Sequence, residues 1–187
     1  MDSSDEIRWF PMRVTYAREE QVKAFLDQVG IENYLPLHYE YIERGRRRRQ
    51  VLRPAVRNLI FIHDSQKHIT ELKMTIKELL PLRYMVKPAI KLAENTVRHE
   101  IITVPDHQMK MFLKVTAHPD NKLVYMENLD FAGRPGKRVK VVAGDFTGIE
   151  GVIKRVKRNK CVVVQIEGVV AVAIAYIPQA FLRVIDD

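Results

Sequence analysis

The amino-acid sequence predicts an α+β protein with two domains, of which the second contains strands alone. Over the first part of the chain, apolar residues at three- and four-residue spacing alternate with segments of period two, as helices and strands require. After Gly136 only short period-two segments remain. Residues 116–133 lie between these parts, show neither period and are rich in turn-forming residues. We therefore expect domains at 1–115 and 134–187, joined by a linker at 116–133.

The first domain is expected to place helices against a mostly antiparallel sheet, in the order β-α-β-β-α-β with a trailing helix. Gly30 suits the end of the first helix, because glycine readily takes the left-handed conformation found there. Gly45 allows the tight turn of a β-hairpin whose tip is rich in arginine. The expected elements are strand 8–16, helix 19–29, strands 34–43 and 51–62, helix 67–80, strand 82–92 and a short helix after Pro105.

The second domain is expected to form a small β-barrel, because its short apolar strands are separated by glycine-containing turns. A barrel of this size has an adequate but marginal core. The single cysteine, Cys161, lies in the apolar run CVVVQI and is expected to be an inert core thiol. The expected strands are 138–142, 151–156, 161–166, 169–177 and 181–185.

The charge of the chain favours polyanionic partners. Its formal net charge is +8 and its pI is near 9.6, and clustered Lys and Arg gain free energy by displacing counterions from phosphates. Nucleic acid is the first expectation and an anionic protein surface the second. Residues 43–57 contain seven arginines and one acid, and 154–160 form a second basic cluster. The alternative for either cluster is a solvated surface that keeps the protein soluble.

The sequence contains no pattern typical of an enzyme, a metal site or a membrane protein. Its six histidines lack the spacing and the cysteine companions of zinc sites. Neither a Gly-x-Ser-x-Gly elbow nor a phosphate-binding loop occurs. The N-terminus is acidic, and no apolar run approaches the ~20 residues that cross a bilayer. We expect a cytoplasmic protein that is not an enzyme, binds no metal or other cofactor, and has no membrane partner.

Two parts of the chain resemble a known family. The segment GKRVKVVAGDFTGIEGVIKRV at 136–156 resembles the KOW motif, with a strand of alternating Val and basic residues and a Gly-x-Phe-x-Gly turn. The Trp9-Phe10 strand, Tyr34-Leu35-Pro36, the arginine-rich hairpin and Asn58-Leu59-Ile60-Phe61-Ile62 are similar to NGN, the N-terminal domain of the NusG family. The resemblance extends from Trp9 to Val184 and implies a transcription elongation or antitermination factor with an NGN and a KOW domain.

The resemblance also implies an RNA polymerase contact. In this family the N-terminal domain docks a hydrophobic patch onto the clamp helices of the β′ subunit and bridges toward the β subunit, which disfavours pausing. The patch carries over to Leu59 and Phe61, with Tyr34 and Pro36 beside them. Alternation along a strand places Leu59 and Phe61 on one face, as a shared docking surface requires. The alternative is that Phe61 belongs to the core.

The sequence departs from the usual family pattern near this patch. Arg57 stands where the family usually has proline, and Leu59 stands where it has an aromatic residue. These departures, together with residues 102–109, resemble the specialised paralogues of Bacteroides-type bacteria that antiterminate surface-polysaccharide operons, the UpxY group. The resemblance therefore favours such a paralogue over a housekeeping factor, and it leaves open whether pausing is raised or lowered.

For the KOW domain, the resemblance implies contact with a protein, either a small-subunit ribosomal protein or the termination factor Rho. Phe146 and Ile149 are expected to be exposed at the tip of a turn, where apolar side chains favour a partner over solvent. The alternative is that they close the end of the barrel.

The hairpin tip is expected to bind nucleic acid, either upstream DNA or the non-template strand. Because residues 44–53 contain no aromatic side chain, we expect phosphate contact there instead of base reading. A second hypothesis for the whole chain is a KOW-containing RNA-binding protein associated with the ribosome. The arginines proposed for the contact are Arg44, Arg46, Arg47, Arg48 and Arg49.

Overall fold

The computed structural model divides the chain into two compact units. One unit comprises Met1–Pro36 and Arg57–Asp106, and the other comprises Leu37–Val56 and His107–Asp187. The structure describes residues 4–45, 47–88, 90–93, 96–117, 123–126 and 136–185, without the side chains of Arg44 and of residues 90–98.

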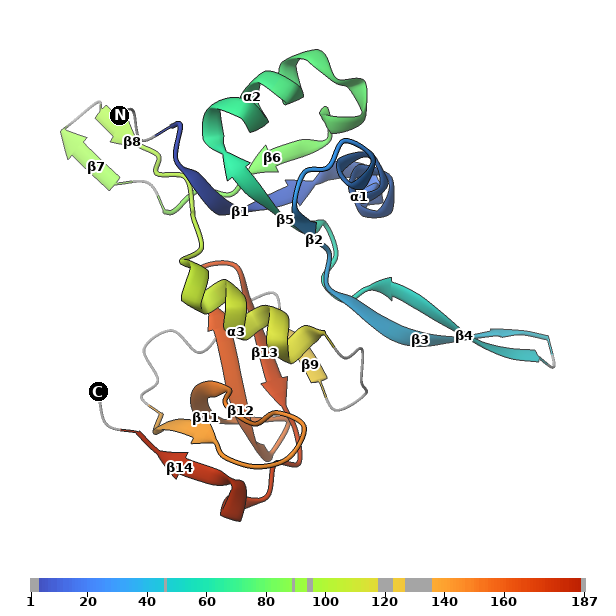
Figure 1. Ribbon diagram of the computed structural model, residues 1–187, viewed down its shortest axis with the longest axis vertical. Coiled ribbons are helices and arrows are strands. Elements are labelled where there is room, and N and C mark those ends of the chain that lie inside the picture. The colour runs from blue at the N-terminus through green and yellow to red at the C-terminus, as the bar shows by residue number, and fades with distance from the viewer. Residues whose placement is uncertain are drawn as a thin grey trace. The chain divides into compact units, whose positions relative to one another are not determined.

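The first unit is built on a four-stranded antiparallel sheet with the strand order β2-β5-β1-β6 (Figure 1). Its strands and helices begin in the predicted order β-α-β-β-α-β, but the single strand expected at 82–92 is divided into β6 and β7, which belong to different sheets. Two 3-10 turns follow β1 and α2, and a separate two-stranded sheet is formed by β7 and β8. The elements of this unit are β1 (Ile7–Val14), α1 (Glu19–Gln28), β2 (Asn33–Tyr34), β5 (Leu59–Ser65), α2 (Gln66–Thr75), β6 (Leu82–Tyr84), β7 (Ile90–Ala93) and β8 (Thr96–Arg98).

Helix α2 packs on one face of this sheet. The Thr70 hydroxyl lies 3.1 Å from the Tyr84 hydroxyl, and the Lys73 ammonium lies 4.6 Å from the centre of the Tyr84 ring. Tyr84 pairs with Met12, so Met12 shares this face, because directly opposed residues in a sheet point the same way. Residues one position along the strands, such as Phe61, point to the other face.

The two long strands expected at 34–43 and 51–62 are each divided in the structure. Pro36 has no N–H to donate to a sheet, and the chain leaves the four-stranded sheet there. Asn58 has a positive φ of 59°, which no regular strand accommodates. The carboxylate of Glu19, which is 4% exposed, accepts a hydrogen bond from the Asn58 N–H at 2.5 Å and fixes this turn.

The outer halves of these divided strands form a β-hairpin, β3 (Leu37–Arg44) and β4 (Arg47–Pro54). Within the part of the chain that the structure describes, β3 and β4 pair only with each other. Gly45 at the tip has a φ of 60°, in agreement with the glycine turn that the sequence predicts. The hairpin is therefore a two-stranded ribbon with two faces.

The second unit contains a six-stranded antiparallel sheet with the order β14-β10-β11-β12-β13-β9. Val162 pairs with Ile174, and Val139 lies on the same face of the sheet, offset by two residues along β11. Each of these three side chains is at most 2% exposed. They form its core. Besides the hairpin strands β3 and β4, the elements of this unit are α3 (Asp106–Thr116), β9 (Leu123–Met126), β10 (Arg138–Val141), β11 (Glu150–Val156), β12 (Asn159–Ile166), β13 (Val170–Ile174), a 3-10 turn at Gln179–Phe181, and β14 (Leu182–Val184).

The compact units group the residues differently from the expected domains 1–115 and 134–187, which stay a prediction. Strand β9 lies within the expected linker 116–133, and it pairs with β13 through four residues. Helix α3, expected as the trailing helix of the first domain, groups with the C-terminal strands from His107 onward. The Lys114 ammonium donates to the Thr147 carbonyl at 2.6 Å, and His107, Gln108 and Met111 line a cavity of 180 Å³ together with residues of β10, β11 and β12.

The fold class predicted from the sequence is confirmed. The first unit is an α/β sandwich on an antiparallel sheet, and the strands from β10 onward form an all-β region.

Candidate functional site

The hairpin presents two chemically different faces. Register pairs His38 with Arg53 and Ile42 with Arg49, so these four residues share one face. Tyr39 pairs with Leu52 and Tyr41 pairs with Gln50, which places both tyrosines on the opposite face. We call the first the arginine face and the second the tyrosine face.

The arginine face is concave and exposed. A groove with a volume of 840 Å³ is lined by Ile42, Val51 and arginine side chains of β4. Among the described residues, Arg47, Arg49 and Arg53 have no ion-pair partner, and all three are exposed. The register places a single acid, Glu40, on this face beside these arginines. Crowded cations are unfavourable in isolation, so a face with this excess of positive charge is suited to a polyanion.

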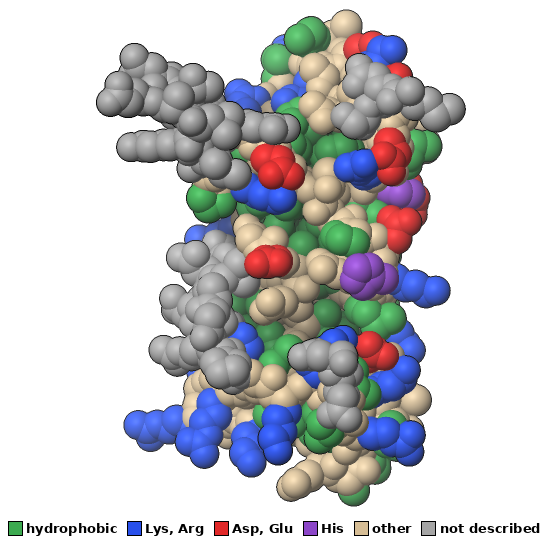
Figure 2. Space-filling view, turned by 90° about the vertical axis from the view of Figure 1, so that its left-hand side faces the viewer, with side chains coloured by type: hydrophobic (Ala, Val, Ile, Leu, Met, Phe, Trp, Pro, Cys, Tyr) green, Lys and Arg blue, Asp and Glu red, His purple; other side chains and the backbone are tan. Residues whose placement is uncertain are grey.

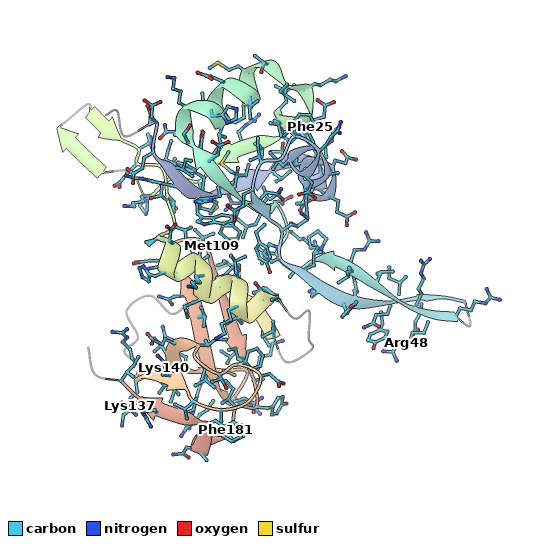
Figure 3. All side chains as sticks on the ribbon, in the orientation of Figure 1. Phe25, Arg48, Met109, Lys137, Lys140 and Phe181 are labelled. Carbon is cyan, nitrogen blue, oxygen red and sulfur yellow. The ribbon has the colours of Figure 1, made fainter. Side chains whose placement is uncertain are left out.

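The tyrosine face carries an aromatic and a cationic group in contact. Tyr39 is 41% exposed and Tyr41 is 46% exposed. The Arg48 guanidinium, labelled in Figure 3, lies 4.1 Å from the centre of the Tyr41 ring. Sequence reasoning missed this face because it considered residues 44–53 alone, whereas the tyrosines lie on the partner strand. Period-two alternation along 37–44 was the signal that could have found it.

Of the five arginines predicted to bind nucleic acid, three are described in full. Arg47, Arg48 and Arg49 are exposed on β4. By register Arg47 and Arg49 belong to the arginine face and Arg48 to the tyrosine face. Arg48 also lines part of the groove, so its side chain contributes to both surfaces. Arg46 and the side chain of Arg44 lie outside the described residues. Arg53, which the prediction omitted, joins Arg47 and Arg49 on the same face and lines the same groove.

The second basic cluster lies on the sheet of the second unit. Lys157 and Arg158 form the turn between β11 and β12, with positive φ values of 48° and 71°. Val156 and Cys161 beside them are buried. Burial raises the pKa of the Cys161 thiol, in keeping with the expected inert core thiol. Figure 2 shows Lys and Arg side chains gathered on this unit, at the lower end of the view.

The structure brings together three of the residues predicted to bind polymerase. Tyr34 is the cross-strand partner of Phe61, and Leu59 lies on the same face of β5. The indole of Trp9 continues this face and stacks on the His63 ring at 4.6 Å. Leu59 is only 4% exposed and Phe61 is fully buried, whereas Tyr34 is half-buried. Pro36 is buried as well. The burial of Phe61 therefore agrees with the alternative that this side chain belongs to the core.

The expected exposure of Phe146 and Ile149 is wrong. Phe146 is 8% exposed and Ile149 is fully buried. The Ile149 N–H donates to the Phe146 carbonyl at 3.1 Å, and the Ile149 carbonyl accepts from Val141 at 2.8 Å. The turn therefore folds back onto β10 and carries both side chains into the interior. Their role in partner binding stays a prediction.

Neither a cluster of metal ligands nor a membrane-spanning helix is found among the described residues. No group of three or more His, Cys, Asp or Glu side chains that could hold a metal ion occurs among the described residues. None of the helices in the described part of the chain is long and apolar enough to span a membrane.

Comparison with known proteins identifies two matching sequence families. The family described as "Transcription termination factor nusG" matches residues 7–113, and the family described as "KOW motif" matches residues 135–167. No curated protein sequence matches the chain.

Solved structures of similar length were also found. One, described as "Domain interaction in Thermotoga maritima NusG", is 14% identical with a TM-score of 0.46, and the match covers 97% of this chain and 98% of that chain. Another, the crystal structure of the "MjSpt4:Spt5 complex conformation B", is 13% identical with a TM-score of 0.27 and covers 96% and 97% of the two chains.

Proposed function

Since the chain belongs to the NusG family, we propose that it is an elongation and antitermination factor that binds RNA polymerase through its N-terminal domain and modulates pausing or termination. The observation that carries this proposal is the family match over residues 7–113, followed by a KOW motif at 135–167. The family consists of transcription factors without catalytic activity, which confirms the expectation that the chain is not an enzyme.

Polymerase contact is proposed at the sheet face formed by Tyr34, Leu59 and Phe61, with Pro36 at its border. The partners are the clamp helices of the β′ subunit, with a bridge toward the β subunit. Support comes from the register, which aligns Tyr34 with Phe61 on a single face. Because Leu59 and Phe61 are buried in this structure, docking at this face requires that they become accessible.

The arginine face of the hairpin is proposed to contact nucleic acid in the elongation complex, either upstream DNA or the non-template strand. Its exposed guanidinium groups and its concave surface support this role. The finer proposal, a UpxY-like paralogue acting on surface-polysaccharide operons, rests on the departures at Arg57 and Leu59. For the KOW domain, we propose contact with a small-subunit ribosomal protein or Rho, and a cytoplasmic location follows from these partners.

A second candidate function is an RNA-binding protein associated with the ribosome. The basic side chains gathered on the second unit favour it, because a phosphate backbone is attracted to such a surface (Figure 2). On this hypothesis the KOW region, and not the hairpin, makes the main nucleic-acid contact.

Affinity capture with the tagged full chain distinguishes the two candidates. Recovery of core polymerase subunits from native lysate, repeated with purified core polymerase, is the expected result. Recovery of ribosomal particles without polymerase would support the second candidate and contradict the first.

The docking face is tested with Tyr34→Ala, which is half-buried and so perturbs the fold less than Phe61→Ala. We expect weaker polymerase binding, because truncating an aromatic anchor at an interface typically costs ~2 kcal/mol or more. Tyr176→Ala is the matched control, since Tyr176 is a tyrosine of the other unit and is 79% exposed. Equal polymerase affinity of the two folded variants would remove this face from the proposal.

A further inference from the structure

The tyrosine face of the hairpin has the chemistry of a stacking platform. Two tyrosines separated by one residue project from the same side of β3, and each exposes more than two fifths of its surface. Exposed aromatic rings in succession on a strand are how many proteins hold unpaired bases, since every base offers a flat face. Leu52, which pairs with Tyr39 and is 45% exposed, extends the apolar surface beside it.

Arg48 adds a second kind of stacking surface. Its guanidinium lies 4.1 Å from the centre of the Tyr41 ring, so one side of this planar group is held against the aromatic ring. Guanidinium planes stack on bases as aromatic rings do. The Tyr41 and Arg48 pair therefore offers a flat surface that carries a cation, which suits a stacked base. Glu43, the cross-strand partner of Arg48, lies on the same face and offsets part of this charge.

The two tyrosines stand far enough apart to meet different bases. Residues two apart on a strand lie about 6.6 Å from one another, so the rings of Tyr39 and Tyr41 are separate stacking surfaces on β3.

We propose that the tyrosine face of the hairpin binds unpaired nucleotides by stacking bases on Tyr39 and on the Tyr41 and Arg48 pair. This proposal rests on the nucleic-acid contact of the hairpin proposed above and makes that contact more specific. The hairpin would recognise a single strand through its bases and not through phosphate contact alone. It also departs from the expectation, drawn from residues 44–53, of phosphate contact instead of base reading. Six arginines and two glutamates between Leu37 and Pro54 favour an anionic partner, and the exposed rings of Tyr39 and Tyr41 favour one that carries bases to stack.

The test uses the full chain and labelled oligonucleotides without polymerase, so that its outcome does not depend on polymerase docking. Fluorescence anisotropy is measured with a single-stranded oligothymidylate, an oligouridylate of the same length and a duplex of the same length. The variants are Tyr39→Ala with Tyr41→Ala, and Tyr39→Phe with Tyr41→Phe as the matched control that keeps both rings. Circular dichroism confirms folding of each variant.

We expect the alanine variant to lose roughly tenfold or more in affinity for the single strands, because each stacked base contributes roughly a 5- to 150-fold effect on alanine substitution. The phenylalanine variant should bind as the wild type does. Duplex affinity should change little in either variant, and the salt dependence should stay parallel, since no charge is altered. Preference for oligothymidylate or oligouridylate identifies the strand as DNA or RNA.

Three outcomes would overturn the proposal. Unchanged single-strand affinity in the alanine variant would show that the tyrosines do not stack on bases. An equal loss for single strand and duplex would show that they support the fold of the ribbon and not base contact. Loss of polymerase capture with unchanged oligonucleotide binding would assign the tyrosine face to a protein partner. If the proposed function were wrong instead, the wild-type chain would fail to capture polymerase, whatever the oligonucleotide result.

Discussion

The hairpin and the turn between β11 and β12 are both rich in basic residues, yet they use these residues differently. In the hairpin, β3 and β4 pair only with each other among the described residues, and both faces are exposed or half-buried. In the second cluster, β11 and β12 belong to a six-stranded sheet, and Val156, Cys161 and Val163 are buried. The basic side chains therefore lie on a separate two-stranded ribbon in one region and on the outside of a buried core in the other.

The difference shows that the role of a basic segment depends on whether the residues that alternate with its cations are buried or exposed. Residues between the cations of the second cluster contribute to folding, so selection for a core can explain that strand. The residues between the hairpin arginines bury little, and Tyr39, Tyr41 and Leu52 remain exposed. An exposed ribbon with exposed aromatic side chains has no comparable structural explanation, which favours a binding role.

The largest expected effect tests this contrast in stability. Ile174→Ala, at a fully buried position of β13, should lower the free energy of unfolding by about 2–5 kcal/mol, because it leaves a cavity in the core. Ile42→Ala, the same substitution on the arginine face, should cost about 1 kcal/mol or less, because little surrounds that side chain. Urea denaturation followed by circular dichroism measures both. Equal losses would mean that the hairpin belongs to a core, and the contrast would fail.

The next expected effect concerns salt dependence. Changing Arg46, Arg47, Arg48 and Arg49 to glutamine should weaken binding to assembled elongation complexes most at low salt. Each lost phosphate contact should flatten the slope of log affinity against log salt concentration by about 0.7–0.9. The matched control changes four cations of the second cluster, Lys154, Lys157, Arg158 and Lys160, to glutamine.

The control set should leave the slope nearly unchanged if the KOW region contacts protein. Parallel lines for the wild type and the hairpin variant would leave the hairpin arginines as a solubility feature. A flattened slope for the control set alone would favour the RNA-binding candidate function.

Much of the fold could be predicted from the sequence, because its elements have strong periodicity. Helix 19–29 was expected from its apolar spacing and is α1, and the strands of the second domain follow short runs of valine and isoleucine. The division of the long strands was not predicted. It depends on Glu19, which fixes Asn58 from 39 residues away, and no local pattern records that hydrogen bond.

The candidate site was predicted in part, for a similar reason. The arginines were visible as composition, but the two faces of the hairpin follow from a register that only the structure fixes. Strand β9 has only four residues and depends on pairing with β13, so its local sequence was read as linker. The burial of Phe146 results from a turn folding back onto β10, which exposure arguments from a loop tip could not anticipate.

Two turns of the molecule are each held by a hydrogen bond with a distant side chain, and the bond made by Glu19 is the more buried of the two. Its buried carboxylate accepts from the Asn58 N–H where the chain returns from the hairpin to β5. Glu19→Ala should lower the free energy of unfolding by about 1.5–3 kcal/mol, since a hydrogen bond to a charged group is lost and a donor is left without its partner. Glu19→Gln keeps an acceptor and should cost less. Equal losses in urea denaturation would show that packing, and not the hydrogen bond, holds this turn.

The smallest expected effect concerns the exposed hydrogen bond between helix α3 and the turn that joins β10 to β11. The Lys114 ammonium of α3 donates to the Thr147 carbonyl at 2.6 Å, in the turn that leads from β10 to β11. Because water competes for an exposed ammonium, Lys114→Met should cost only about 0.5–1 kcal/mol. Lys110→Met is the matched control, since Lys110 is an exposed lysine of the same helix. Thermal melting of the two variants, compared at low and high salt, measures the difference. A larger loss of stability for Lys114→Met than for Glu19→Ala would contradict this order. The exposed bond of Lys114 would then stabilise its turn more than the buried bond of Glu19 stabilises the turn at Asn58.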